Sequence, residues 1–464
     1  MRYVWLVLAV FFSRFLTTAI AFPQVDGDIG WQRWLGSKIL TDGQIPRNLG
    51  LETFSSVGSP WTPQEWLFSI MAWKSGSGPF WWLFAGAIAL APVIAILISV
   101  QRSRLRGSSE RVNLIISAFM GIAMFQSFGV RAQILGWLFL AIFVYLLEID
   151  NQRSYFALAV VILWSNFHAS VIIAPILSGI LLLGSFLDDR GFSERCKRLS
   201  IITIGSFFAF CVNPFGINLP LYAISLLSSP IKQYILEWRR VSIDDFSFMV
   251  GALPLLLIAI IFGARRSTWR DRLLLLAAIG LCITAARNVV VAAILVSPIA
   301  AGALTLSHSL FSVKPRNPET SIDKKAIWVL PVIAFTMAIF LSIGLLHQPA
   351  DPEEDLAYEP LSALQSIPGE HRLLCGDFGW CGNMVGKKNI RVFLDGRADP
   401  YPISVWNTYV DIVKTKVGWQ KEVDQNQINT IVVRKKSRLS KALAKEKGWK
   451  NAYSDSRFSL WTKG

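Results

Sequence analysis

Long apolar blocks constrain the fold of this chain more than any other feature. The clearest of them occupy residues 4–22, 80–100, 112–128 and 132–147. They are continuous runs rather than amphipathic stripes, and most approach the roughly 20 residues that cross the hydrocarbon core of a bilayer. The chain is 53% hydrophobic and only 17% charged, whereas soluble domains carry roughly a quarter charged residues. We therefore expect an all-α polytopic membrane bundle.

Basic loops between the apolar blocks predict the topology. The net charge is +15, and short cytoplasmic loops collect Lys and Arg. Four such loops stand out, at residues 101–111, 188–198, 264–272 and 313–325. If all four are cytoplasmic, the number of crossings between them is even, which requires residues 154–187 to form a hairpin that turns near 166–168. This pattern predicts about 11 spans with a cytoplasmic N-terminus, and it gives no reason to expect nucleic acid as a partner.

The chain divides into three regions. Residues 1–110 hold the first spans with an external loop at 23–64, residues 111–346 hold the transmembrane helical bundle, and residues 347–464 form a soluble extracytoplasmic domain. Apolar runs of strand length at 390–394 and 428–433 alternate with helical patterns at 405–415 and 439–447, which predicts an α/β domain. An Asp395–Arg397 contact is expected to be structural.

Two cysteines lie in the predicted extracytoplasmic domain. Cys375 and Cys381 flank a segment with two glycines, and an oxidising compartment permits a disulfide between them. Two free thiols are the alternative. A zinc site is not favoured, because no second Cys pair and no His pair lie near them.

The first external loop carries acidic residues beside tryptophans. Its polar stretch at 26–31 contains Asp26 and Asp28, and apolar residues then recur at helical spacing until Gly43. A glycine there is typical of a helix C-terminus. We expect a helix lying in the membrane interface, with its tryptophans at headgroup depth and the carboxylates at its start.

Asp26 and Asp28 are the candidate catalytic residues. In one interpretation, one of them caps the interfacial helix while the other is solvated. In the other, one of them is the general base of a sugar transfer. A sugar carried on a lipid phosphate already has a good leaving group, so its transfer mainly requires that the acceptor hydroxyl be deprotonated. Glu65, at the entry to the next apolar block, either starts a helix or hydrogen-bonds sugar hydroxyls. A third alternative is a divalent metal bound by the acidic pair with Glu65. No cofactor is expected.

Three further polar residues interrupt apolar sequence on the predicted external side. Arg131 and Arg287 are either snorkelling anchors or guanidinium groups that bind the phosphate of a lipid donor. His168, in the predicted hairpin turn, is either a hydrogen-bonded structural residue or a contact to phosphate or acceptor. We take Glu65, Arg131, His168 and Arg287 as candidate substrate-binding residues.

An ordered series of short motifs resembles a family of bacterial polytopic proteins related to the C-type glycosyltransferases, GT-C. That superfamily includes the dolichyl-phosphate-mannose protein mannosyltransferases and the bacterial aminoarabinose lipid A transferases. The series consists of residues 26–31, 43–46, 61–67, 131–133, 166–168, 213–216, 237–238, 287–288, 393–397 and 418–419. The chain departs from the pattern at Gln32, where a His is expected, and at Val130, where a Pro is expected.

The resemblance implies a GT-C fold with about 11 spans and an inverting glycosyltransferase in the bacterial inner membrane. A sugar would pass from a polyprenyl-phosphate donor to an extracytoplasmic acceptor, which is a protein, a lipid or a polysaccharide. By the same analogy, the base is Asp26 or Asp28, and Asp28 is favoured because it directly adjoins the interfacial helix.

Two other functions remain open at this point. A flippase or transporter of lipid-linked saccharides would carry charged residues near the membrane midplane in both halves and an internal repeat, and only Arg14 approaches that description. A non-catalytic assembly protein of envelope polysaccharide export would keep the fold but tolerate the loss of Asp28.

Overall fold

The computed structural model describes residues 2–25, 27–263, 267–311 and 357–464. Contacts divide them into two compact units. The bundle unit takes the described residues of 1–19, 85–224 and 235–347. The sheet unit takes those of 20–84, 225–234 and 348–464. Asp26, the basic loop at 313–325 and the boundary near 347 lie outside the described residues.

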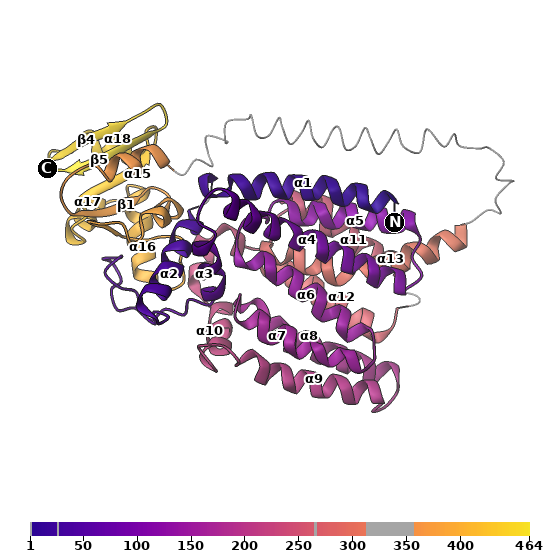
Figure 1. The fold of residues 1–464 in the computed structure, drawn as a ribbon. Helices are drawn as coiled ribbons and strands as arrows, with labels where there is room; N and C mark the ends of the chain where they lie inside the picture. The colour runs from indigo at the N-terminus through magenta and orange to yellow at the C-terminus, as the bar shows by residue number, and fades with distance from the viewer. Residues whose placement is uncertain (1, 26, 264–266, 312–356) are drawn as a thin grey trace. The chain divides into compact units, whose positions relative to one another are not determined.

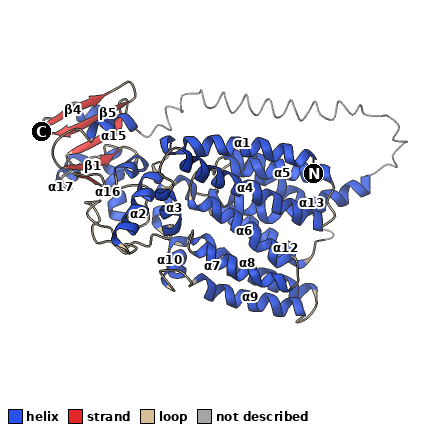
Figure 2. Cartoon of the chain, viewed as in Figure 1, coloured by secondary structure: helices blue, strands red, loops and turns tan. Residues whose placement is uncertain are grey.

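The bundle unit is built almost entirely from helices (Figures 1 and 2). Because their sequences are apolar on nearly every face, packing rather than amphipathic patterning orders them. α13 lies against α5, α6, α11 and α12, while α9 lies against α7 and α8. The helices are α1 (Arg2–Val25), α4 (Pro79–Leu105), α5 (Glu110–Phe125), α6 (Ala132–Glu148), α7 (Phe156–Ser165), α8 (Ile173–Asp188), α9 (Glu194–Phe210), α11 (Leu253–Gly263), α12 (Trp269–Thr284) and α13 (Val289–Phe311). Shorter turns are η1 (Gln152–Tyr155), η2 (Ala169–Ile172), η4 (Leu236–Trp238), η5 (Ser247–Ala252) and η6 (Ala286–Asn288).

Among the described residues, four helical segments are long and apolar enough to cross a membrane, which agrees with a multi-pass membrane protein. They are Val4–Ala21, Pro79–Leu105, Ala169–Asp188 and Ala286–Thr305. Shorter apolar helices occur at Ala132–Glu148, Asn218–Leu227 and Ser247–Gly263. The count of about 11 spans stays a prediction.

Helices that follow the basic loops begin with hydroxyl caps. The side chains of Ser109, Ser193 and Thr268 accept hydrogen bonds from backbone N–H groups in the first turns of α5, α9 and α12. Such a cap satisfies one of the donors that a helix start leaves unpaired. Local sequence therefore fixes where the chain re-enters the bundle after each described basic loop.

Ion pairs gather three of the basic loops at one end of the bundle unit. Arg102 donates to both carboxylate oxygens of Glu148 at 2.8 and 2.9 Å, and Arg106 joins Glu148 to Asp271. The same end holds pairs of Asp150 with two arginines of α9, and of Asp188 with Arg270.

The predicted hairpin at 154–187 is confirmed by these ion pairs. The start of α7 follows the Asp150 end of α6, and α8 returns to that end at Asp188, so the chain reverses between the two helices. The turn at 166–168 therefore lies at the opposite end. So do Arg131, which precedes α6, and Arg287, which follows α12.

Breaking the Arg102–Glu148 pair should destabilise the bundle unit. Arg102 is only 1% exposed and also donates to the Ile294 carbonyl at 2.7 Å. Glu148→Gln leaves this cation without its charged partner, so we expect a loss of about 3 kcal/mol in unfolding free energy. Denaturant unfolding in detergent micelles measures it. Lys197→Gln, which removes an exposed pair with Glu194, is the control and should change stability by less than about 0.5 kcal/mol.

The sheet unit combines the first loop with the C-terminal domain. Its five-stranded sheet has the order β2-β1-β3-β5-β4, with β1 parallel to β2 and β3, and β5 antiparallel to β3 and β4. The strands are β1 (His371–Cys375), β2 (Ile390–Val392), β3 (Thr430–Arg434), β4 (Trp449–Ser454) and β5 (Phe458–Lys463). The helices are α2 (Asp28–Asp42), α3 (Trp66–Lys74), α10 (Asn218–Leu227, shared with the bundle unit), α15 (Tyr358–Leu364), α16 (Ile403–Val413), α17 (Trp419–Gln425) and α18 (Arg438–Leu443), with short turns η3 (Pro230–Tyr234) and η7 (Phe378–Met384).

The first loop extends this sheet beyond β2. Thr53 forms a parallel bridge with Val392. The Val392 N–H donates to the Glu52 carbonyl at 2.9 Å, and the Phe54 N–H donates to the Val392 carbonyl at 3.2 Å. Pairing of this kind covers the edge of β2, whose backbone groups would otherwise need other partners. The first loop and the C-terminal domain are therefore one structural body.

The predicted α/β pattern of the C-terminal domain is confirmed. β2, β3, α16 and α18 fall within or beside the expected segments. A disulfide joins Cys375 to Cys381, with their Cα atoms 5.9 Å apart, so of the two alternatives the structure shows the bridge. It ties the end of β1 to η7.

Candidate active site

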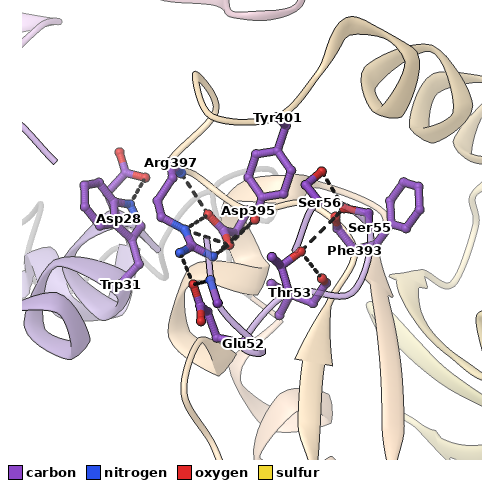
Figure 3. Close-up of polar contacts among 12 residues, drawn as sticks. Asp28, Trp31, Glu52, Thr53, Ser55, Ser56, Phe393, Asp395, Arg397 and Tyr401 are labelled. Atoms are coloured by element: carbon purple, nitrogen blue, oxygen red, sulfur yellow. Dashed lines mark hydrogen bonds and ion pairs between the residues drawn. The ribbon is translucent and has the colours of Figure 1, made fainter. Parts of the chain in front are cut away.

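The favoured candidate base, Asp28, is the first residue of α2. Its Oδ1 atom accepts a hydrogen bond from Trp31 Nε1 at 3.1 Å (Figure 3). A carboxylate in the first turn also faces the positive end of the helix dipole. The same oxygen lies against Gly396, where a Cβ atom would be 2.0 Å from Asp28 Oδ1. Two residues of the sheet unit, Trp31 and Gly396, therefore contact this oxygen.

Glycine-to-glycine contacts bring the start of α2 onto η7. A Cβ atom on Gly27 would lie 1.8 Å from the Gly379 carbonyl oxygen, and one on Gly382 would lie 2.2 Å from the Gly27 carbonyl oxygen. Only glycine permits backbones to approach this closely. The disulfide-bonded turn η7 therefore packs directly against Gly27, the residue that precedes Asp28.

The tryptophans of α2 pack inside the protein. Trp31 and Trp34 both lie 6.4 Å, between ring centroids, from Trp61, and Trp31 is buried. The helix itself, including its left-handed cap at Gly43 with φ of 67°, is where the sequence predicted it. The helix also packs against α3 and η7, and its position at the membrane interface stays a prediction.

Glu65 lies at the N-terminal end of α3 and is linked to α2. Gln32 Nε2 donates to Glu65 Oε2 at 2.6 Å, and Gln64 donates to the other oxygen at 3.3 Å. Gln32 is only 2% exposed. The residue that departs from the family pattern therefore binds the candidate sugar-binding carboxylate.

A buried ionic cluster lies beside Asp28 in the sheet unit (Figure 3). Arg397 donates to both oxygens of Asp395 and, at 2.8 Å, to Glu52 Oε1 of the first loop. Tyr401 donates to Asp395 at 2.6 Å. Asp395 is fully buried and Arg397 is 3% exposed. Burial raises the pKa of the Tyr401 hydroxyl well above its usual range, so the phenol stays protonated and able to donate.

Arg397 also contacts aromatic rings of the first loop. Its guanidinium carbon lies 5.0 Å from the Trp61 ring centroid and 5.4 Å from that of Trp34. Burial alone would lower the pKa of Arg397, but the Asp395, Tyr401 and Glu52 groups raise it well above its usual range. The expected Asp395–Arg397 contact is present, whereas the contact of Arg397 with Glu52 was not predicted.

The bundle unit holds the other three candidate residues. Arg131 pairs with Glu237, and the Arg287 guanidinium lies 4.6 Å from the ring centroid of the adjacent Trp238. His168 is close enough to Arg287 to be affected by its charge. The cluster lies at the end of the unit opposite the basic loops. The structure therefore groups Arg131, His168 and Arg287, and it places Asp28 and Glu65 in the other unit.

His168 is held as a neutral ring. Its Nδ1 atom accepts a hydrogen bond from the Ser170 N–H at 3.0 Å, which caps η2 and leaves the ring proton on Nε2. Burial, with the Arg287 cation as second cause, lowers the pKa of His168 to about 3. At neutral pH, His168 therefore offers a hydrogen-bond donor but no charge.

Stability should depend on the titration of His168. Between pH 6.5 and about 3 the unfolded chain binds a proton at this ring and the folded chain does not, so acidification favours unfolding by about 1.4 kcal/mol per pH unit. In detergent, the unfolding temperature of the wild type should fall between pH 6.5 and 4.5 more steeply than that of His168→Gln. Equal slopes for the two proteins would contradict this assignment.

Metal binding has no assembled ligand set in the part of the chain that the structure describes. No group of three or more His, Cys, Asp or Glu side chains there could hold a metal ion. Asp26, which belonged to the proposed acidic site, lies outside the described residues.

Comparison with known proteins identifies the fold. No protein-family model matches the chain, and no curated protein matches it. Three solved structures of the oligosaccharyltransferase AglB from Archaeoglobus fulgidus are similar. The complex with an inhibitory peptide and a dolichol-phosphate has a TM-score of 0.58 at 13% identity, over 95% of this chain and 70% of that one. The complex with Zn and sulfate has a TM-score of 0.57 at 12% identity, over 95% of this chain and 69% of that one. The form tethered to an acceptor peptide has a TM-score of 0.58 at 12% identity, over 92% of this chain and 68% of that one.

At this level of identity the similarity shows the fold alone. The chain shares its fold with these oligosaccharyltransferase structures over most of its length, and its own described residues form apolar helices and a small C-terminal sheet domain, as the sequence predicted in outline. The links to bacterial and mannosyltransferase families stay predictions.

Proposed function

We propose that this chain is a membrane glycosyltransferase that moves a sugar from a polyprenyl-phosphate donor to an extracytoplasmic acceptor, with inversion. The observation that carries the proposal is the held carboxylate of Asp28. It begins α2, is fixed by Trp31 Nε1 at 3.1 Å, and belongs to a chain whose fold is similar to that of solved oligosaccharyltransferase structures. One of those structures contains a dolichol-phosphate, which is a lipid phosphate of the proposed class.

Asp28 acts as the general base in this proposal. It accepts the proton of the acceptor hydroxyl as the acceptor oxygen bonds to the anomeric carbon, and the bond from that carbon to the phosphate oxygen breaks. The electron pair leaves with the polyprenyl phosphate. A base must lie within hydrogen-bond reach of the proton it takes, and a carboxylate already in contact with Trp31 and Gly396 loses little freedom when the acceptor arrives. Asp26 is the second candidate for this role.

Arg131 and Arg287 bind the donor phosphate, and His168 donates to it from Nε2. Guanidinium groups match phosphate geometry, and they offset the charge that grows on the leaving phosphate. Their present contacts, Glu237 and the Trp238 ring, keep them oriented. Glu65, fixed by Gln32, accepts hydrogen bonds from sugar hydroxyls.

The proposal includes a topology. About 11 spans lie in the bacterial inner membrane, with the N-terminus in the cytoplasm and the sheet unit outside. The basic end of the bundle unit, with Arg102, Arg106 and the arginines of α9, then faces the cytoplasm, as the positive-inside rule requires.

Complementation of a deletion strain distinguishes an enzyme from a non-catalytic assembly protein. Asp26→Asn, Asp28→Asn and the double variant are compared with wild type at equal expression. If the chain is an enzyme that uses one of these carboxylates, at least the double variant should fail to restore the envelope glycan. Full restoration by both single variants and by the double variant would exclude a catalytic role for this pair.

A further inference from the structure

The contacts around Asp28 come as much from the far end of the chain as from its own loop. Gly396 touches the carboxylate, Gly379 and Gly382 touch Gly27, and Val392 pairs with the Glu52–Phe54 backbone. The first loop also contributes its side chains to the C-terminal domain, since Ser55 donates to the Phe393 carbonyl and Thr53 donates to that of Val392 at 2.9 Å. The two segments thus meet both through backbone and through side chains.

We propose that the C-terminal segment Gly396–Arg397 is part of the active site, with Arg397 acting as a positioning residue for Asp28 through Glu52 and Trp34. The inference rests on the proposed function for the role of Asp28. It assigns a function to the C-terminal domain, which is to set the position of the base.

Three contacts give Arg397 this role. Its side chain is anchored in the C-terminal domain by three hydrogen bonds to Asp395, one to Oδ1 and two to Oδ2, at 2.6 to 3.2 Å. Its NH1 atom donates to Glu52 at 2.8 Å, and its guanidinium carbon lies 5.4 Å from the ring centroid of Trp34 on α2. A buried, bidentate arginine has little freedom to move. It therefore fixes both the loop and the helix that carry Asp28.

Gly396 makes the second connection to Asp28. Because its Cβ position is filled by the Asp28 carboxylate and lies 3.3 Å from Trp31 Nε1, any shift of the Gly396–Arg397 backbone moves the surface on which the carboxylate rests. An error of about 1 Å in a reacting group can lower a rate about a hundredfold. The position of Arg397 is thereby coupled to the rate.

Glu52→Gln isolates this coupling. It removes the charge that joins the loop to Arg397 but keeps an acceptor oxygen for the Gly50 N–H, and it leaves the Asp395–Arg397–Tyr401 contacts intact. The matched control is Asp42→Asn, which removes an exposed pair with Lys38 on α2. Full-length protein in lipid nanodiscs is used for all variants.

Hydrogen exchange gives the first readout. In Glu52→Gln we expect amides of residues 28–34 and 52–54 to exchange at least about tenfold faster, with β3 and β5 unchanged, whereas Asp42→Asn should match wild type. Sugar transfer gives the second readout. In Glu52→Gln, kcat should fall about 10- to 100-fold, and the KM for the donor should stay unchanged. Unchanged exchange at 28–34 would overturn the inference. If wild type transfers no sugar, the proposed function fails while exchange still decides whether Arg397 positions Asp28.

Discussion

Asp28→Asn should lower kcat for sugar transfer by about 10²–10⁴-fold, the contribution of a general base. Asparagine has the same shape, keeps an oxygen to accept from Trp31 Nε1, and fits against Gly396. It cannot take a proton at neutral pH. The fold should therefore be retained while proton transfer is lost, and the KM for the donor should change little. Steady-state transfer by purified protein in lipid vesicles measures both constants.

The control for this prediction is Asp42→Asn, at the other end of the same helix. Asp42 is exposed and pairs only with Lys38 among the described residues, so its loss should leave kcat within about twofold. A value of kcat for Asp28→Asn near that of the control would remove Asp28 from the mechanism.

Arg397→Ala should destabilise the sheet unit by about 5 kcal/mol. The substitution leaves two buried carboxylates, Asp395 and Glu52, without their cation, and breaking a buried pair costs about 3–5 kcal/mol. The loss of the contacts with the Trp34 and Trp61 rings adds to this. Pulse proteolysis in urea, read on fragments of the C-terminal domain, measures the unfolding free energy.

Arg391→Ala serves as the matched control, because Arg391 is half-buried on β2 and makes no ion pair within the described ranges. It should change stability by less than about 1 kcal/mol. If Arg397→Ala behaved like this control, the ionic cluster would not be what joins the first loop to the C-terminal domain.

Local patterns in the sequence predicted the elements that have local causes. Helix α2 follows from apolar spacing that ends at Gly43, and β2 and β3 follow from β-branched runs. β4 was missed because its side chains are mostly exposed, so it lacks the alternation that marks a half-buried strand. β1 was missed because it begins with His371 and Arg372, which leaves only three apolar residues in the strand.

The candidate site was predictable only in part, for a physical reason. The acidic residues of the first loop stood out because charge beside tryptophan is costly near a bilayer. The Glu52–Arg397 pair joins positions 345 residues apart, and nothing near either residue indicates the other. The opposite charges of Asp395 and Arg397 after an apolar strand predicted a contact between these two residues, but they did not predict the contact with Glu52.

As a glycosyltransferase of the proposed kind, the chain must break the bond between a sugar and a polyprenyl phosphate. The direct measurement is release of polyprenyl phosphate in vesicles that contain the purified wild-type protein, donor lipids and envelope acceptors from the native host. We predict one polyprenyl phosphate for each sugar transferred, with inverted anomeric configuration in the product. Full recovery of intact donor, as in vesicles without the protein, would contradict the claim.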